Sequence, residues 1–160
     1  MTELETSFAT ARVLSYAPGR DAALAEHCAV ALLETPTIHE VPGAPAHCLG
    51  LIAWTGTLIP LIDLEMLAGH EDDKRAVMPG HVLVIAWQPD AGAALQYGAV
   101  CAPSLVSSIR VTDAQSCDPP EGTHELASVA AAFFERDGRP VPILDTRSLF
   151  AAREHAASFA

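Results

Sequence analysis

Positively charged residues are scarce in this chain. Of its 160 residues, nine are Lys or Arg and twenty are Asp or Glu, which gives a formal net charge of −11. Nucleic acids and anionic membrane surfaces attract proteins through clustered Lys and Arg side chains. The charge balance therefore argues against both as partners and favours a partner with a basic surface.

Long hydrophobic runs are also missing. The longest apolar runs, such as residues 29–33 and 82–87, have the length of a β-strand and fall far short of the roughly 20 residues that cross a bilayer. Residues 1–10 carry two glutamates and no apolar core, so we expect no signal peptide. The sequence predicts a cytoplasmic protein without direct membrane insertion.

Motifs that carry chemistry are absent as well. The four cysteines form no C-x-x-C pair, which predicts buried, reduced thiols. The histidines lack the i, i+3 or i+4 spacing of metal ligands on one helical face. No nucleophile elbow, phosphate-binding loop or dinucleotide fingerprint occurs. We therefore expect no cofactor and no metal; the residues concerned are Cys28, Cys48, Cys101 and Cys117, and His27, His39, His47, His70, His81, His124 and His155.

The chain is instead rich in apolar residues. Half of the residues are hydrophobic and 18% are charged, a balance that excludes a disordered chain. A protein of this length buries roughly 68–70% of its unfolded surface and needs no disulfide or metal to stabilise it. We expect one domain, or two small lobes that share a core.

One motif occurs twice. Residues 56–64 and 138–146 both read G-x-x-x-P-x-x-D, with apolar residues at matching positions, and their aspartates Asp63 and Asp145 are 82 residues apart. Leu67 and Leu149 each follow four residues after the aspartate. A repeat at half the chain length predicts two similar lobes, because solenoid repeats have periods of roughly 20–50 residues.

Short strands and frequent turns dominate the rest of the chain. The segment 22–35 is compatible with a helix or with a buried strand at 28–33. Asp63 and Asp145 are each placed to cap a following helix, the second spanning 146–158. Residues 69–80 and 115–123 read as linkers. Such a pattern is typical of small β-barrels; strands are expected at 12–16, on both sides of Thr55-Gly56 within 49–64, and at 81–87, 95–101, 105–111, 129–134 and 140–144.

The paired aspartates admit a second interpretation. Aspartic proteases hold two carboxylates, one from each lobe, around a shared water. Residues 142–146 superficially resemble their apolar-apolar-Asp-Thr-Gly loop, but Arg147 and Leu64-Glu65 stand where glycine would be needed for close backbone approach. Helix capping is the favoured role of both aspartates, and a twin-aspartate hydrolase is the remote alternative.

Several segments in order resemble the CheW family. They are Val-Pro-Gly-Ala-Pro at 41–45, residues 50–64, Tyr-Gly-Ala-Val at 97–100, and residues 138–149. The match covers about residues 12–150. The resemblance implies a mainly β protein of two five-stranded SH3-like barrel lobes around a shared hydrophobic core, with short helices and a C-terminal helix. It divides the chain into an N-terminal tail (1–11), the CheW-like domain (12–150) and a helical tail (151–160).

The chain departs from this family at the first hairpin. The family usually has Asn-x-Arg-Gly, whereas residues 53–56 read Ala-Trp-Thr-Gly, so Thr55 occupies the arginine position. A glutamate that is common in the preceding strand aligns near Ala31. Losing both charges together is physically coherent, because one remaining buried charge would be costly. The resemblance places contacts to the kinase at Ala31, Trp54, Thr55 and Gly56.

The roles of several apolar residues stay open at this point. Trp54 could belong to the core or to an interface, where tryptophan is enriched among the residues that dominate binding. By alignment, the family's receptor groove between the lobes would be lined by residues that could equally be plain core: Ala29, Leu32, Val82, Gly98 and Leu105.

The resemblance implies a function based on binding. Members of the family are non-enzymatic adaptors that link methyl-accepting chemoreceptor tips to the regulatory domain of a CheA-type histidine kinase, in chemotaxis or in chemosensory control of type IV pilus twitching. The stretch at 41–45 and the short N-terminus look slightly closer to the pilus-associated members. Because the charge pair is missing, the alternative is a divergent CheW-like module that is decoupled from receptor arrays and serves another regulator.

Overall fold

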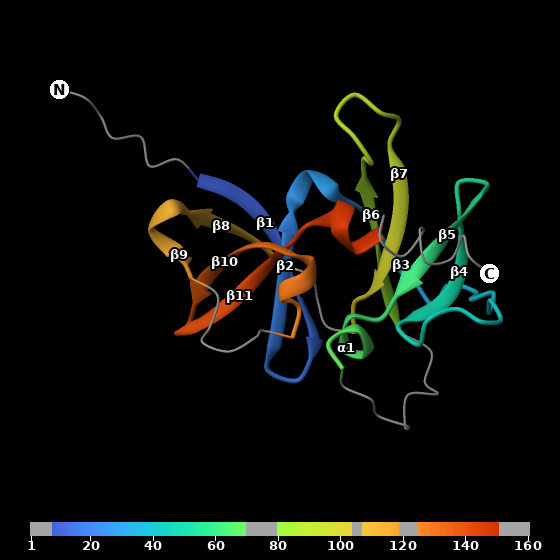
Figure 1. Ribbon diagram of the computed structural model, residues 1–160, viewed down its shortest axis with the longest axis horizontal. Helices are drawn as coiled ribbons and strands as arrows, with labels where there is room; N and C mark the ends of the chain where they lie inside the picture. Colours follow the sequence, from blue (N-terminus) through green and yellow to red (C-terminus); the bar gives the residue numbers. More distant parts are fainter. Residues whose placement is uncertain (1–7, 70–79, 104–106, 119–124, 151–160) are drawn as a thin grey trace.

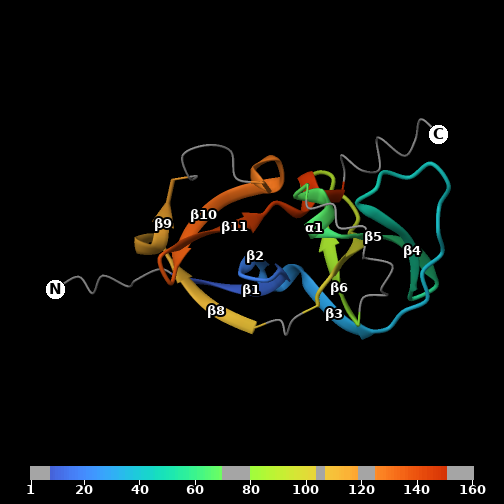
Figure 2. The same cartoon turned by 90° about the horizontal axis from the view of Figure 1, so that it is seen from below.

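The computed structural model describes residues 8–69, 80–103, 107–118 and 125–150, which form two β-sheets lying side by side (Figures 1 and 2). The first sheet has the strand order β8 (Ser107–Thr112), β1 (Phe8–Ala17), β2 (Arg20–Ala25), β11 (Arg139–Leu144), β10 (Ala130–Arg136) and β9 (Ser116–Cys117). The second has the order β3 (Ala29–Glu34), β6 (His81–Trp87), β7 (Gln96–Cys101), β5 (Thr57–Ile62) and β4 (Cys48–Trp54).

Helices are few and short among the described residues. They are α1 (Leu64–Leu67), a helical segment at 146–150, and the 3-10 turns η1 (Glu26–Cys28), η2 (Asp113–Gln115) and η3 (Ala127–Val129). The prediction of a mainly β protein with two strand-built lobes is therefore confirmed. The first sheet has a sixth strand because the two-residue β9 adds to β10.

Strand β6 shows how the second sheet is built. Alternate residues of a strand face opposite sides of the sheet. Val82 and Val84 belong to the cluster on one face, while Leu83, Ile85 and Trp87 belong to the cluster on the other. Both faces of this strand are buried, which explains why residues 82–87 form an uninterrupted apolar run instead of an alternating one.

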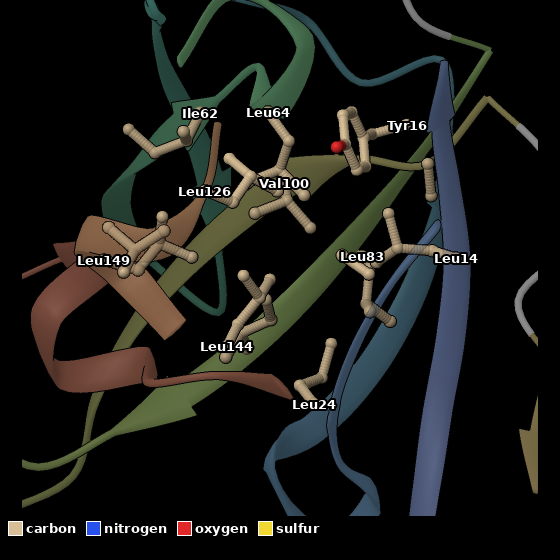
Figure 3. Close-up of a cluster of buried hydrophobic side chains, with 14 of the residues drawn as sticks. Leu14, Tyr16, Leu24, Ile62, Leu64, Leu83, Val100, Leu126, Leu144 and Leu149 are labelled. Carbon is tan, nitrogen blue, oxygen red and sulfur yellow. The ribbon is translucent and has the colours of Figure 1, made fainter. Parts of the chain in front are cut away.

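The core lies between the two sheets (Figure 3). Leu14 and Leu24 enter it from β1 and β2, and Leu83 and Val100 enter it from β6 and β7. Leu149, from the segment after β11, is also fully buried there. Each sheet has in addition a smaller cluster of its own, so the fold consists of two lobes joined by a shared apolar layer.

The sequence repeat corresponds to a repeated structural unit. β4–β5 and β10–β11 are antiparallel hairpins, and the second strand of each pairs in parallel with another strand, β7 or β2. The backbone N–H of Asp63 donates to the carbonyl of His47 at 2.8 Å, and that of Asp145 donates to Val129 at 2.8 Å. His47 and Val129 both lie directly before the first strand of their hairpins, so the two copies close in the same way.

Both repeated aspartates cap helical turns, as predicted. A side-chain oxygen of Asp63 accepts the backbone N–H of Glu65 at 3.0 Å. Asp145 accepts the backbone N–H of Arg147 at 3.2 Å and the hydroxyl of Ser148 at 2.8 Å. These bonds satisfy donors that have no partner within the first turn of a helix.

The N-terminal third differs from the prediction at its first strand, and its ambiguous segment 22–35 is now assigned. β1 begins at Phe8, so residues 8–11 of the predicted tail belong to the sheet; residues 1–7 lie outside the described part. The segment 22–35 is not a helix but the end of β2, η1 and β3. Ala22, Ala23 and Leu24 are fully buried in a strand flanked by β1 and β11, and this packing overrides the helical preference of alanine.

Other expectations are met in part. The loop predicted at 115–123 contains the short strand β9, and residues 119–124 lie outside the described residues. Of the helix predicted at 146–158, residues 146–150 are helical and the remainder falls outside the described part. Most of the predicted linker at 69–80 falls outside it too.

Replacing either capping aspartate by alanine should destabilise the protein. Asp63→Ala and Asp145→Ala should each lower the free energy of unfolding by about 1 kcal/mol, because each leaves N–H donors of a helical turn unsatisfied. Urea unfolding followed by circular dichroism measures the change. Asp113→Ala, at an exposed aspartate, is the control and should stay within about 0.5 kcal/mol of the original protein. Unchanged stability with loss of partner binding would instead assign Asp63 and Asp145 to a binding surface.

Candidate functional site

The first candidate surface is the tip of the β4–β5 hairpin. Thr55 and Gly56 are exposed and have φ angles of 44° and 80°, as in the type I′ turns that suit two-residue hairpins. Trp54 is half-buried and packs against the apolar cluster inside the second lobe. It is thus neither a fully enclosed core residue nor a fully exposed one, and part of its surface stays available beside the turn.

Ala31 is connected to the hairpin tip only through the apolar cluster of the second lobe. It lies on β3, at the opposite edge of the second sheet from β4, and it packs against the same cluster as Trp54. The structure therefore brings Ala31 and Trp54 to a common apolar cluster, and the exposed Thr55 follows directly after Trp54. Ala31 and Thr55 are both uncharged, so neither position leaves a charge without a partner.

The outer face of β3 is apolar and exposed. Leu32 has 47% of its surface exposed and Val30 has 42%. Their neighbour Ala31 points the other way, toward the cluster inside the lobe, while Ala29 packs against the central core. Because β3 is an edge strand, Val30 and Leu32 form a short apolar strip at the rim of the second sheet.

Two of the residues expected to line a receptor groove are core residues. Val82 is fully buried inside the second lobe. Gly98 lies beneath the ring of Phe150, and a Cβ atom built at this position would overlap that ring. Their side-chain positions are therefore not accessible, which corrects the expected lining. Leu105 lies outside the described residues, so Ala29 and Leu32 are what the described structure retains of that lining.

Sequence reasoning missed an apolar groove on the second lobe. This groove has a volume of about 600 Å³. The loop before β4, strand β5 and the start of β7 line this groove, together with two aromatic rings. Its lining includes Val41, Cys48, Leu58, Trp87, Leu95 and Phe150. Segments far apart in the sequence create this groove, so no local motif signals it, although the Pro and Gly residues at 42–45 do mark the loop that forms one wall.

A charged pocket lies at the end of the first lobe. The Tyr16 hydroxyl donates to Glu125 at 2.5 Å, and the Arg20 guanidinium contacts the same carboxylate at 2.7 Å. Burial, together with the hydrogen bond to Glu125, raises the pKa of Tyr16 well above its usual range. Arg136 lies 4.0 Å from Asp21. Four of the charged side chains that line this pocket are thus paired within the protein, which favours a structural role for them over binding of an external ion.

The described residues show no arrangement suited to redox or metal chemistry. The four cysteines are thiols, and Cys101 alone is buried, whereas Cys28, Cys48 and Cys117 are half-buried, which corrects the expectation of buried thiols. Within the described ranges, no group of three or more His, Cys, Asp or Glu side chains could hold a metal ion. In that part of the chain, no helix is long and apolar enough to cross a membrane.

The paired aspartates do not form a shared site. Asp63 is nearly completely buried, with 3% exposure, and its carboxylate is directed to the backbone of α1. Asp145 is directed to its own helical turn in the other copy of the repeat. Neither residue lines the apolar groove or the charged pocket. The geometry therefore supports capping and gives the hydrolase alternative no active site.

Comparisons with known proteins agree with this geometry. The family model described as the CheW-like domain matches residues 19–154. Among solved structures, the fold is similar to that of the scaffolding protein TtCheW from Thermoanaerobacter tengcongensis, with a TM-score of 0.70 and 18% sequence identity, over 87% of this chain and 90% of that one. A search of curated proteins found no match.

The hairpin tip carries a local strain that can be relieved. Thr55 is β-branched, yet it holds a positive φ of 44°, which such residues rarely adopt. Thr55→Asn should raise the free energy of unfolding by about 0.5–1 kcal/mol, because Asn-Gly is the preferred pair in this turn. Thermal and urea unfolding measure the gain. Thr57→Asn, in the adjacent extended strand, is the control and should bring no gain; an equal gain from both would show that turn geometry is not the cause.

Proposed function

The chain belongs to the CheW-like domain family, and on that premise we propose that it is a non-enzymatic adaptor that couples chemoreceptors to a CheA-type histidine kinase. The observation that carries this proposal is apolar surface left open at two places on the second lobe: the half-buried Trp54 beside the hairpin turn, and the exposed strip of Val30 and Leu32. Both are suited to protein contacts, since exposed apolar patches commonly mark interaction surfaces.

The hairpin tip is the proposed contact for the kinase regulatory domain. Trp54 presents part of its surface beside an exposed, tightly folded turn, and Ala31 packs against the same apolar cluster as Trp54. Tryptophan is enriched among the few residues that dominate binding energy at interfaces. In this chain the contact would rest on apolar packing by Trp54, because Thr55 and Ala31 supply no charge.

The strip on β3 is the proposed contact for the receptor tip. Leu32 and Val30 are spaced two residues apart on an edge strand and project from its outer face. A helical receptor tip carries apolar residues at i, i+3 and i+4 that can pack onto such a strip. Ala29, at the start of β3, would form the inner side of this contact, next to the central core.

The proposed setting is a cytoplasmic signalling array. Individually modest contacts to kinase and receptor can sum to firm assembly when both are held in one array. The net charge of −11 favours partner faces that carry basic residues around an apolar centre. We further propose the pilus-associated branch of chemosensory systems, on the basis of the 41–45 stretch alone.

A second candidate function is a CheW-like module that serves another regulator. The observation that favours it is the joint replacement of the family's glutamate and arginine by Ala31 and Thr55. An adaptor that no longer needs the usual kinase contact could lose this pair together without leaving an uncompensated charge. The same hairpin tip would then bind a different protein, again through Trp54.

A crossed binding experiment tests the two proposed contacts. Trp54→Ala should weaken binding of the cognate kinase regulatory domain by roughly 30-fold, as expected for an interface tryptophan, and should leave receptor binding unchanged. Leu32→Ser should do the reverse. Isothermal titration against each partner measures both, and melting temperatures check that each variant is folded. No saturable kinase binding by the original chain at high micromolar concentration would contradict the adaptor proposal.

Restoring the family arginine separates the two candidate functions. If the chain is a decoupled module, Thr55→Arg should leave the autophosphorylation rate of the kinase in reconstituted receptor arrays unchanged. If it is an adaptor with a weakened kinase contact, this variant should increase receptor-dependent kinase activity. Thr55→Lys, which keeps the charge but lacks the planar guanidinium, is the matched control. A clear gain with arginine alone would reject the decoupled module.

A further inference from the structure

Arg12 lies where the outer surface of the first lobe meets the central core. Alternate residues of a strand face opposite sides of the sheet. On β1, Leu14 belongs to the central core, whereas Ala11 and Val13 belong to the cluster inside the first lobe. Arg12 is on the same side of β1 as Leu14, and it is half-buried. It therefore marks the rim of the apolar layer that joins the two lobes.

Three polar side chains from separate elements meet at this rim. The Ser108 hydroxyl, on β8, donates to an oxygen of Glu26, on η1, at 2.8 Å. The Arg12 Nε lies 3.4 Å from the same oxygen, and Ser108 is the residue directly opposite Arg12 in the β1–β8 pairing. These three residues form a polar rim cluster, which links the first sheet to the turn that leads into the second.

The polar rim cluster leaves hydrogen-bonding groups open. The Arg12 Nε is buried but makes no hydrogen bond, since its contact with Glu26 is only an ion pair. A guanidinium can donate, and a carboxylate can accept, several hydrogen bonds at once. Among the described residues, the terminal nitrogens of Arg12 and the second oxygen of Glu26 have no protein partner. Each side chain is 37% exposed, so a partner can reach these groups.

This cluster adjoins the apolar strip that is proposed to contact the receptor tip. η1 runs directly into β3, so Glu26 precedes Val30 by four residues. β8 and β3 lie along the same side of the molecule (Figure 2). The exposed strip of Val30 and Leu32 is thus followed, toward the first lobe, by the pair of Arg12 and Glu26. A partner that lies on the strip and reaches the first lobe would meet this pair.

The charges of the pair select the chemistry of the partner group. Arg12 and Glu26 lie side by side, and their formal charges cancel. A partner carboxylate would be attracted by Arg12 but repelled by Glu26, and a partner ammonium would meet the reverse. A carboxamide carries an acceptor oxygen and N–H donors without a net charge. It can accept from Arg12 and donate to Glu26 at the same time, and it brings no uncompensated charge into the contact.

We propose that Arg12 and Glu26 recognise an asparagine or glutamine side chain of the receptor tip and thereby set which receptor the protein accepts. This inference rests on the proposed receptor contact, in which apolar residues of the tip pack on Val30 and Leu32. The amide lies on the same helical face as those residues, where positions three or four apart are neighbours. Apolar packing supplies affinity, and the amide supplies discrimination, because polar groups left without partners in a contact are costly.

Calorimetric titration with the cytoplasmic tip fragment of a chemoreceptor from the same cell tests this inference. Glu26→Gln exchanges the open carboxylate oxygen for an N–H donor, and Arg12→Met removes the guanidinium. Each should weaken binding of the tip about tenfold, as expected for a lost hydrogen bond to a charged group, and should leave binding of the kinase regulatory domain unchanged. Arg136→Met is the matched control, since Arg136 pairs with Asp21 at similar exposure on the first lobe, and it should leave both affinities unchanged.

A double-mutant cycle identifies the partner group. Each asparagine and glutamine of the tip fragment is replaced in turn by leucine, and one of these changes should also weaken binding about tenfold. Combined with Glu26→Gln, that change should cost little more than either change alone, since both remove the same contact. Melting temperatures verify that each variant is folded.

Four results would contradict the inference. Loss of binding by Leu32→Ser without any effect of Arg12→Met or Glu26→Gln would keep the receptor contact and reject the polar recognition. Tighter binding by Glu26→Gln would assign a carboxylate to the partner in place of an amide. Equal losses of receptor and kinase binding would show that the cluster only supports the fold. No saturable binding of the tip by the original chain would reject the receptor contact together with this inference.

Discussion

Strand β6 is buried on both faces, and this double burial joins the two halves of the protein. Val82 and Val84 contribute to the interior of the second lobe, whereas Leu83, Ile85 and Trp87 contribute to the layer between the sheets. Because one strand serves two clusters, neither lobe can lose its partner without exposing apolar surface of the other. Leu149 and Phe150, which follow β11, are also buried in the shared layer. Residues from both halves of the chain therefore pack in this one core.

The repeated unit explains how two similar lobes close onto that layer. In each copy a hairpin ends in an aspartate whose N–H returns to the residue before the hairpin and whose carboxylate caps the next helical turn. The aspartate thus fixes the direction in which the chain leaves the sheet. This directs Leu64 in one copy and Leu149 in the other into the common core. The motif that suggested paired catalytic carboxylates is a device for orienting chain segments.

Apolar side chains that remain exposed outside this core indicate where the protein could bind other chains. They lie mainly on the second lobe, at the strip on β3 and around the apolar groove. In the charged pocket of the first lobe, Arg20 pairs with Glu125 and Arg136 with Asp21. Exposed apolar surface of this kind commonly packs against other chains, and no group of three or more metal-ligating side chains occurs among the described residues. The family match, which covers most of the chain, agrees with a scaffold.

The sequence by itself determined the two lobes, both hairpins and both caps. These features depend on local chemistry: glycine after Thr55 and Asp137 allows tight turns, and an aspartate before a helical turn accepts its N–H groups. Tertiary structure alone decided that 22–35 forms two strand segments joined by a 3-10 turn and not a helix. It also decided that Val82 and Gly98 are enclosed, that Trp54 is half-buried, and that a groove forms beside Phe150. Each of these depends on which distant segment packs against the residue, and in a strand a shift of one residue exchanges the inner and outer faces. A single sequence specifies the alternation of its side chains but not which face the rest of the chain will cover.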